Sequence, residues 1–333
     1  MIRVALLLPL AAVAFGLLLQ ALFQRMVRFD VMAPPPDAVN DEALTSFFAG
    51  TGSLLCVGCT RGIGAGIARA ACARGAGVIV VGRLDSRPLL GGCTSDRLRF
   101  IRADLSSMRA AVELVGQLAP QSVSTVVFTV GIVNGAARQE SVEGIEREVA
   151  VSFLSRFVIT AELLKSNVLA STPNRRPRLF VMGFPGAPDV PQLDDFNWDR
   201  VEWHAWRSHM NTVVANDALV IGVGRRESSV NIYGLNPGII RTGLMYDFLG
   251  GRDSWLSRAQ QVVIGLVCPS VDDYAPTVLQ LVASPQLEAR SGTFFNQYAE
   301  QIAPCPWLLA EEGNVERVWA EADNLRRRAL AVA

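Results

Sequence analysis

The fold is decided by the stretch Leu54-Leu55-Cys56-Val57-Gly58-Cys59-Thr60-Arg61-Gly62-Ile63-Gly64. An apolar run leads into three glycines, and apolar residues then recur at helical spacing over residues 67–72, which predicts a strand, a glycine turn and a helix. A second apolar run at residues 78–81 predicts a buried parallel strand. Together these segments predict a strand–helix–strand unit that begins an α/β sheet.

The three glycines of this loop predict a dinucleotide site. Gly58 permits the tight turn, Gly62 lets the backbone approach a pyrophosphate, and Gly64 lets the helix pack closely on the strand. The N-terminus of the following helix would then face the phosphates, where its free N–H groups favour an anion. The other loop residues expected at the cofactor are Thr60, Arg61 and Ile63.

The residue after the second strand predicts which dinucleotide binds. An acid about 20 residues beyond the glycine loop normally binds the ribose hydroxyls of NAD, but this chain has Gly82-Arg83 there. A guanidinium can pair with a 2′-phosphate, and Arg61 can supply a second one, so NADP(H) is favoured over NAD(H). The alternative is that both arginines are solvated surface residues.

The glycine loop and three later segments resemble the short-chain dehydrogenase/reductase family. The loop is similar to its motif T-G-x-x-x-G-x-G, with Val57 in place of the threonine. Residues 100–106 are similar to its third strand and adenine-contacting Asp-Leu pair, and residues 126–131 to its fourth strand and N-N-A-G motif, of which only the glycine remains. Residues 236–242 are similar to the P-G-x-x-x-T segment that closes over the nicotinamide. The resemblance implies a doubly wound parallel α/β sheet, the Rossmann fold, and adds to the cofactor site Asp104, Leu105, Gly131, Pro237, Gly238, Ile240 and Thr242.

The same resemblance implies a catalytic set that this chain does not carry. The family uses a serine, a tyrosine with a lysine four residues later, and an asparagine to move a proton during hydride transfer. A tyrosine without a nearby cation is mostly protonated at neutral pH and is a poor base. The residues at the corresponding positions are Ser152 for the asparagine, Gly183 or Phe184 for the serine, and Trp203 and Arg207 for the tyrosine and lysine.

A histidine is the remaining candidate for proton transfer. Lys165 is the only lysine, and no tyrosine precedes it by four residues, so no shift of register restores the Tyr-x-x-x-Lys pair. His209, at the start of a helix with several polar residues, is a candidate base, with Asn211 or Asn216 orienting a substrate. The alternative is that these side chains cap the helix or satisfy buried backbone groups.

The first residues predict a membrane anchor. Residues 4–23 form an almost unbroken apolar run, which as a helix rising about 1.5 Å per residue spans roughly 30 Å, the thickness of a bilayer core. Arginines on both sides and the lack of an acid before Asp30 place the main domain on the inner side. The alternative is a cleaved signal or transit peptide.

The expected organisation has four parts. Residues 1–29 form the anchor helix, and residues 30–52 form a linker in which Pro34-Pro35-Pro36 is a stiff spacer. Residues 53–300 form the Rossmann domain and residues 301–333 a C-terminal helical extension. Apolar periodicity in the C-terminal part predicts a helix at 274–282, a strand at 291–295 and an amphipathic helix at 314–328.

Composition limits the other classes of function. The formal net charge is zero and the arginines are scattered, so no nucleic-acid partner is expected. The six cysteines are too few and too irregularly spaced for a disulfide scaffold and are predicted to be free thiols. The Cys56/Cys59 spacing allows a redox or zinc motif, but its place at a glycine loop favours plain packing, and no metal is expected. Asp194-Asp195 is read as a solvated loop rather than a metal site.

Two functions are predicted. The first is a membrane-anchored NADP(H)-binding protein without catalysis, an accessory subunit of a membrane complex, in which the bound dinucleotide stabilises the fold. Mitochondrial complex I offers an analogy, since it holds a degenerate member of this superfamily. The mitochondrial inner membrane is favoured over the endoplasmic reticulum, because arginine replaces lysine almost throughout. The alternative is an active NADP(H)-dependent oxidoreductase acting on a lipophilic alcohol or ketone; a soluble sensor released by N-terminal cleavage is a third possibility.

Overall fold

The computed structural model describes residues 30–50, 52–85, 93–94, 96–135, 137–244 and 251–332. The predicted membrane anchor at residues 4–23 lies outside this part of the chain. Within the described part, no helix is both long enough and apolar enough to cross a membrane.

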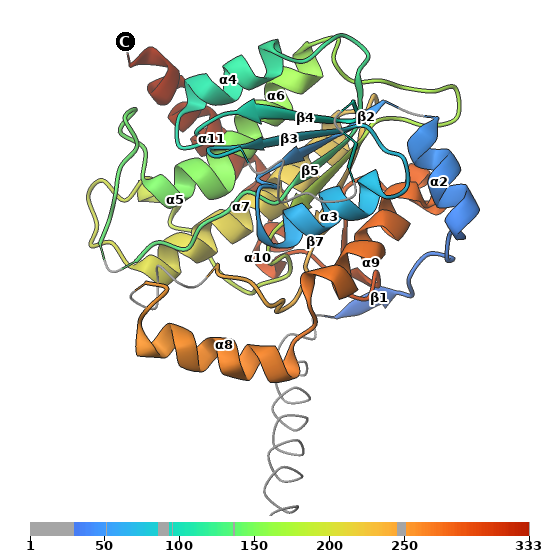
Figure 1. The fold of residues 1–333 in the computed structure, drawn as a ribbon. Helices are drawn as coiled ribbons and strands as arrows, with labels where there is room; N and C mark the ends of the chain where they lie inside the picture. The colour runs from blue at the N-terminus through green and yellow to red at the C-terminus, as the bar shows by residue number, and fades with distance from the viewer. Residues whose placement is uncertain are drawn as a thin grey trace, which may run out of the picture.

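One nine-stranded sheet organises the described chain, with the strand order β1-β9-β8-β7-β6-β5-β2-β3-β4 (Figure 1). The strands from β4 through β8 pair in parallel, and only β9 and β1 at one edge are antiparallel. This confirms the predicted Rossmann-type parallel sheet. The strands are β1 Val31–Ala33, β2 Ser53–Val57, β3 Val78–Gly82, β4 Leu98–Arg102, β5 Val123–Phe128, β6 Arg178–Met182, β7 Asn231–Leu235, β8 Thr293–Phe295 and β9 Gln301–Ile302.

Helices cover both faces of this sheet (Figure 1). Helices α2, α3 and α9 pack on one face, and α4, α6, α7 and α11 pack on the other. The α-helices are α2 Asp41–Ala49, α3 Gly62–Cys72, α4 Met108–Gly116, α5 Arg147–Val149, α6 Ser155–Lys165, α7 Ala205–Arg226, α8 Trp255–Val267, α9 Val271–Ala283, α10 Pro306–Ala310 and α11 Asn314–Ala331. Helices α9 and α11 and strand β8 confirm the elements predicted for the C-terminal part.

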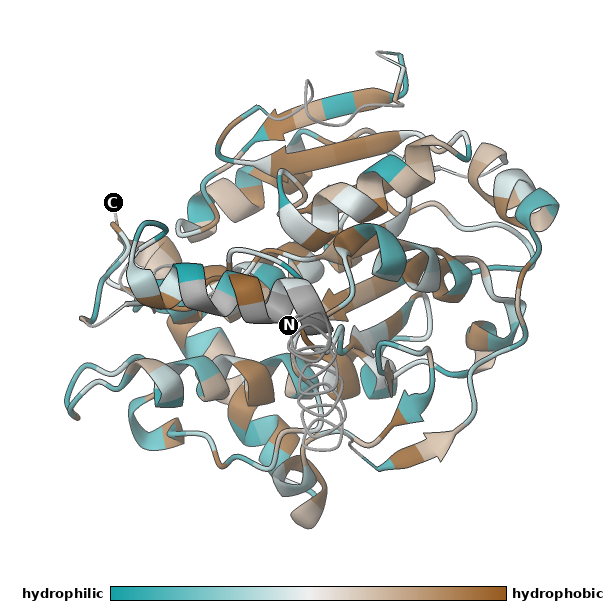
Figure 2. Cartoon of the chain, turned by 60° about the horizontal axis from the view of Figure 1, so that its bottom comes forward, coloured by the Kyte–Doolittle hydropathy of each residue, from teal (hydrophilic) through white to brown (hydrophobic). Residues whose placement is uncertain are grey.

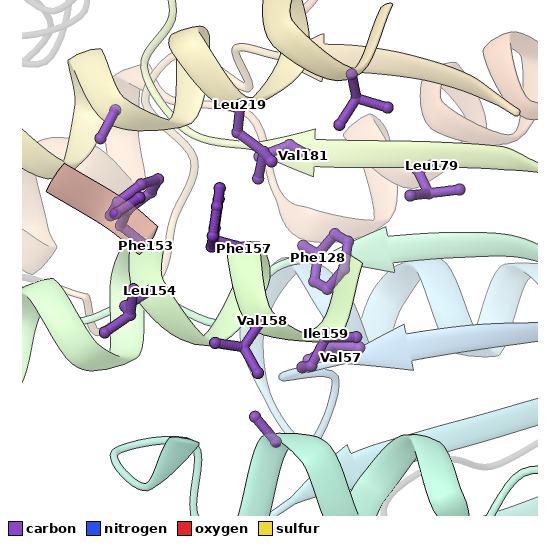
Figure 3. Close-up of a cluster of buried hydrophobic side chains, with 14 of the residues drawn as sticks. Val57, Phe128, Phe153, Leu154, Phe157, Val158, Ile159, Leu179, Val181 and Leu219 are labelled. Carbon is purple, nitrogen blue, oxygen red and sulfur yellow. The ribbon is translucent and has the colours of Figure 1, made fainter. Parts of the chain in front are cut away.

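The central strands are apolar on both faces because each face is covered by helices. Their hydrophobic residues dominate the interior in Figure 2. Along β2, Leu55 and Val57 face one core while Leu54 and Cys56 face the other. Figure 3 shows the core between the sheet and helices α6 and α7, where Phe128, Phe153, Phe157, Val181 and Leu219 gather. This packing fixes α6 and α7 against the strand ends.

The sequence predicted a linker over residues 30–52, but this segment contains a strand and a helix of the fold. Strand β1 extends the sheet by pairing with β9, with Val31 opposite Ile302. Helix α2 is capped by Asn40, whose Oδ1 accepts from the amide of Ala43 at 2.8 Å, and it packs against α9. Residues 301–302 likewise belong to the sheet rather than to a separate helical extension.

The cysteines also differ from the prediction of free thiols. Cys56 is joined to Cys59, and Cys72 to Cys93, with Cα–Cα distances of 5.5 and 5.1 Å. Cys268 and Cys305 are free. The Cys56–Cys59 bridge is possible because the glycine turn after β2 folds the chain back on itself, which brings the two Cα atoms within the usual range for a disulfide.

Candidate functional site

The glycine loop lies at the carboxyl end of β2, where the sheet order reverses. Strand β2 is flanked by β3 and β5, so the chain winds outward from it in both directions, and in open α/β sheets this is the place where ligands bind. Gly58 has a φ of +88°, and a Cβ there would lie 2.7 Å from the Cβ of Val130. A Cβ on Gly64 would lie 2.7 Å from the Sγ of Cys59. Both positions therefore require glycine.

The N-terminus of α3 is open for an anion. Its N-cap residue Arg61 makes no side-chain capping hydrogen bond, so the amides at the start of the helix lack the partner that a cap would supply. A Cβ on Gly62 would meet only Thr242 Cγ2, at 3.7 Å, which shows that the segment ending at Thr242 closes over the loop. An uncapped helix start beneath a glycine turn fits a pyrophosphate.

The residues predicted for the adenosine end follow β3 and β4. Arg83 is exposed directly after β3, and Arg61 is exposed in the glycine loop. Asp104 is exposed after β4, but its Oδ1 accepts from the amide and the hydroxyl of Ser106, at 3.0 and 2.9 Å. Leu105 is buried. The fold thus brings these four residues to the carboxyl ends of adjacent strands, and their contacts with a cofactor stay predictions.

The residues predicted for the nicotinamide end lie across the crevice. Gly131 follows β5 and is partly buried, and Pro237 and Ile240 are buried after β7. Gly238 has a φ of +63°, and its amide donates to Asn236 Oδ1 at 2.9 Å. The two strands that carry these residues flank β6, so the predicted nicotinamide site spans the ends of β5, β6 and β7.

The tyrosine and lysine positions do not form the helical pair that the alignment required. Helix α7 begins at Ala205 with His204 as its N-cap, so Trp203 precedes the helix. Arg207 is exposed in the first turn of α7. Trp203 therefore does not lie on the same helix as Arg207, and the assignment of these two positions to the tyrosine and lysine stays a prediction. Gly183, at the serine position, follows β6 and its amide donates to the carbonyl of Leu235 at 2.9 Å.

Ser152, at the asparagine position, lies in an unusual turn. Helices α5 and α6 are joined by a π-helical segment, η2, over Ala150–Leu154, and such turns are frequent at functional sites. The Ser152 hydroxyl accepts a hydrogen bond from the amide of Ile132 at 3.0 Å, and it donates one to the carbonyl oxygen of Ile132 at 3.2 Å. Ser152 therefore holds the segment that follows Gly131.

His209 forms a dyad with a buried carboxylate. Its Nδ1 lies 2.6 Å from Oε1 of Glu148. The side chain of Glu148 is fully buried, whereas that of His209 is 20% exposed. The other oxygen of Glu148 accepts from the amide of Asn134 at 3.1 Å. A carboxylate held in this way orients the imidazole and leaves Nε2 as the reactive nitrogen, as in other histidine bases.

A second buried carboxyl supports the dyad. Glu146 accepts from the side-chain amide of Asn134 at 2.7 Å and from the Ser208 hydroxyl at 3.2 Å. Burial raises the pKa of Glu146, and the neighbouring Glu148 adds to that rise. Asn134 thus bridges both carboxyls through its side chain and its backbone, which ties the dyad to the loop after β5.

Arg156 is a buried cation at the ends of β5 and β6. Its guanidinium donates to the carbonyls of Val130 and Met182, the latter at 2.6 Å, and to Asn216 Oδ1 at 3.1 Å. Sequence reasoning missed both Glu148 and Arg156. Glu148, Ser152 and Arg156 recur at four-residue intervals, a spacing that places side chains on one helix face and that could have revealed the group.

Asp195, predicted to lie in a solvated loop, has a structural role instead. Asp195 is buried rather than solvated, and it accepts from the amides of Asp199, Arg200 and Val201. Burial alone would raise its pKa, but these hydrogen bonds hold the pKa of Asp195 below its ordinary value. Trp198 is 3% exposed and Trp206 is 55% exposed, so the tryptophans of this segment do not share one surface.

The fold is that of a Rossmann-type α/β protein with a glycine loop where the strand order reverses. The family model for short chain dehydrogenases matches residues 53–172. The "Uncharacterized oxidoreductase YKL107W" of Saccharomyces cerevisiae is 35% identical over 295 residues, covering 88% of this chain and 92% of that protein. The chain therefore belongs to the short-chain dehydrogenase family, whose members bind a nicotinamide cofactor.

More distant relatives share the architecture. The polyprenol dehydrogenase of Mus musculus is 26% identical over 285 residues, covering 79% of this chain and 80% of that protein. A short chain dehydrogenase from Shigella flexneri, whose structure is complexed with NADP, has a TM-score of 0.51. It is 15% identical and the match covers 74% of this chain and 96% of that one, so this likeness shows the fold alone.

Proposed function

We propose that the protein is an active NADP(H)-dependent oxidoreductase in which His209, oriented by Glu148, takes the place of the missing tyrosine and lysine. The observation that carries the proposal is the 2.6 Å contact between a partly exposed imidazole and a buried carboxylate. Side chains that merely cap a helix do not need a buried carboxylate partner, because water can satisfy them.

The dyad suits proton transfer to or from a substrate oxygen. With Nδ1–H donating to Glu148, Nε2 of His209 is available to accept a proton from an alcohol, and the imidazolium can return it to a carbonyl oxygen. The carboxylate stabilises the imidazolium that forms. When bound, the nicotinamide cofactor supplies or accepts the hydride. Neither Trp203 nor Arg207 is needed for this proton path.

The preference for NADP(H) rests on Arg83 and Arg61. Both are exposed, and Arg83 directly follows β3, where an acid would select NAD(H). A guanidinium at this place pairs with a 2′-phosphate through two parallel hydrogen bonds.

A lipophilic alcohol or ketone is the proposed substrate class. The loop after β6, where a family member carries its polar serine, here has Phe184 packed with Met210, Val213 and Ala187. A partly exposed phenylalanine at that place, in a position where the family has a serine, favours an apolar substrate. The polyprenol dehydrogenase named above acts on a long apolar alcohol, which is consistent with this class.

The accessory-subunit function stays a prediction from the sequence, as do the membrane anchor and the mitochondrial location. The accessory-subunit prediction is based on the missing Tyr-x-x-x-Lys pair. If the His209–Glu148 dyad transfers the proton, inactivity no longer follows from the loss of that pair. If the protein is a subunit without turnover, replacing His209 will leave its cofactor binding and its assembly unchanged.

The experiment compares the two histidines. Purified protein is assayed for NADPH oxidation against a panel of apolar aldehydes, ketones and isoprenoid carbonyl compounds, and for NADP⁺ reduction with the matching alcohols. His209→Ala should lower kcat by about a hundredfold or more, because general acid–base catalysis contributes that much. His204→Ala is the matched control, since His204 is exposed and makes no side-chain capping bond, and it should leave kcat unchanged.

The substitution Glu148→Gln tests whether His209 needs its carboxylate partner for catalysis. It keeps the shape of the side chain and removes the charge, so the imidazolium loses its stabilising partner and kcat should fall while cofactor affinity is retained. Turnover by the wild-type protein that survives His209→Ala would contradict the role of the dyad. Binding of NADPH without turnover on any member of the panel would instead favour the accessory-subunit prediction.

A further inference from the structure

Arg156 is the most unusual ionised group near the crevice. Its side chain is almost completely buried, at 3% exposure, and its recorded partners are all neutral: two backbone carbonyls and the Asn216 amide oxygen. A buried charge normally has a partner of opposite sign, because desolvation otherwise costs several kcal/mol. Burial lowers the pKa of Arg156 to about 9, so the group is still charged at neutral pH.

Arg178 provides the contrast within the same strand system. It is buried to 2% exposure at the first residue of β6, but it forms an ion pair with Glu288 at 3.2 Å. Across the part of the chain that the structure describes, no carboxylate lies within ion-pair distance of Arg156. The charge of Arg156 is therefore not neutralised by a described side chain, and its field extends into the surroundings.

The crevice geometry places this charge at the nicotinamide end. The glycine loop after β2 fits the pyrophosphate, and Arg83 and Asp104 mark the adenosine end at β3 and β4. The nicotinamide must then lie on the other side of β2, over β5 and β6. Arg156 binds the carbonyls that end those two strands, and its Nη2 lies 3.5 Å from the position that a Cβ on Gly131 would occupy.

We propose that Arg156 makes the site bind the reduced dinucleotide more tightly than the oxidised dinucleotide. The inference rests on the proposed function. The oxidised nicotinamide ring carries a positive charge and the reduced ring carries none, so an unneutralised cation nearby raises the free energy of the oxidised form alone.

The size of the effect follows from Coulomb's law. For two unit charges at a separation of about 10 Å and an effective dielectric constant of about 20, the repulsion corresponds to a preference of roughly tenfold. A cation of the family's usual kind would lie on α7 and bind the ribose. Arg156 instead comes from the neighbouring helix α6 and is held beneath the strand ends, so its main action is through the field rather than through contact.

The test measures binding rather than turnover. Dissociation constants for NADPH and NADP⁺ are determined separately, by calorimetry, for the wild type, Arg156→Lys and Arg156→Gln. The wild type should bind NADPH about tenfold more tightly than NADP⁺, Arg156→Lys should keep most of that ratio, and Arg156→Gln should bring the ratio close to one. Arg178→Gln is the matched control: it removes another buried arginine from the far end of β6 and should leave the ratio unchanged.

Each result decides the matter. If the wild type binds NADPH and NADP⁺ with equal affinity, the inference is overturned. This measurement needs no variant, so it does not depend on whether Arg156→Gln folds. A ratio that survives Arg156→Gln also overturns it, while the proposed function still stands. A loss of turnover in His209→Ala with the ratio intact bears only on the proposed function. Failure of the wild type to bind either form overturns both.

Discussion

Asp217 offers a test of the packing that holds the loop after β6. It lies on α7 and is 2% exposed, and its Oδ2 accepts from the amide of Gly186 at 3.1 Å and from the amide of Cys305 at 2.9 Å. These two bonds fasten the loop after β6 to the segment before α10. Burial raises the pKa of Asp217 from 3.8 to about 7, although both hydrogen bonds oppose the rise.

The shift sets the sign and size of a pH effect on stability. Because the pKa is higher in the folded state, the folded protein holds this proton more tightly than the unfolded chain. The contribution of Asp217 is fully present below pH 3.8 and is lost as the pH rises towards 7. At 1.36 kcal/mol for each unit of pKa, the loss amounts to about 4 kcal/mol as an upper bound.

Asp217→Asn removes the titrating group and keeps an acceptor oxygen for the two amides. The free energy of unfolding is measured by urea denaturation for both proteins from pH 4.5 to 8.5, and the difference between them is plotted against pH, so that all other titrations cancel. The variant should gain relative to the wild type as the pH rises through 5 to 7, by roughly 2 to 4 kcal/mol in total. A difference that stays flat, or that runs the other way, would show that Asp217 is ionised at neutral pH and refute the reasoning.

Two further predictions concern the glycine loop and its surroundings. Arg83→Asp should weaken NADPH binding by roughly tenfold to a hundredfold, as expected for the loss of charge-assisted hydrogen bonds. The affinities of the variant for NADH and NADPH should then be closer to each other. An unchanged dissociation constant for NADPH would place the 2′-phosphate elsewhere. Thiol titration of the unfolded, unreduced protein should find two free thiols, those of Cys268 and Cys305, and six after reduction; six before reduction would contradict both disulfides.

The fold was predictable because its signals are local. The glycine turn, the apolar runs on both sides of it and the order of the later segments all lie within short windows of sequence. Each dictates one element, and the winding of a parallel sheet then follows from few allowed topologies. The segment 30–52 was not predictable in this way, because β1 is defined by pairing with β9 at the other end of the chain.

The proposed proton-transfer group depends on a contact between residues far apart in the sequence. His209 was identified by elimination, but its partner Glu148 lies 61 residues earlier. Their meeting depends on how α5 and α7 pack. Trp203 and Arg207 were assigned by spacing along the chain, and spacing alone does not show that α7 begins only at Ala205.

The ionisable groups of this site share one physical arrangement. The segment through α5, η2 and α6 faces α7 at successive turns, where Glu148 meets His209 and Arg156 meets Asn216. Asn216 also donates to the carbonyl of Ser152 at 2.9 Å, which links the two levels. Side chains that lie between two helices are held from both sides. The His209–Glu148 pair can therefore keep its orientation without a tyrosine and a lysine on α7. The proposed function is therefore compatible with the loss of the tyrosine and lysine from α7, since Glu148 on α5 and Arg156 on α6 place a carboxylate and a cation beside α7.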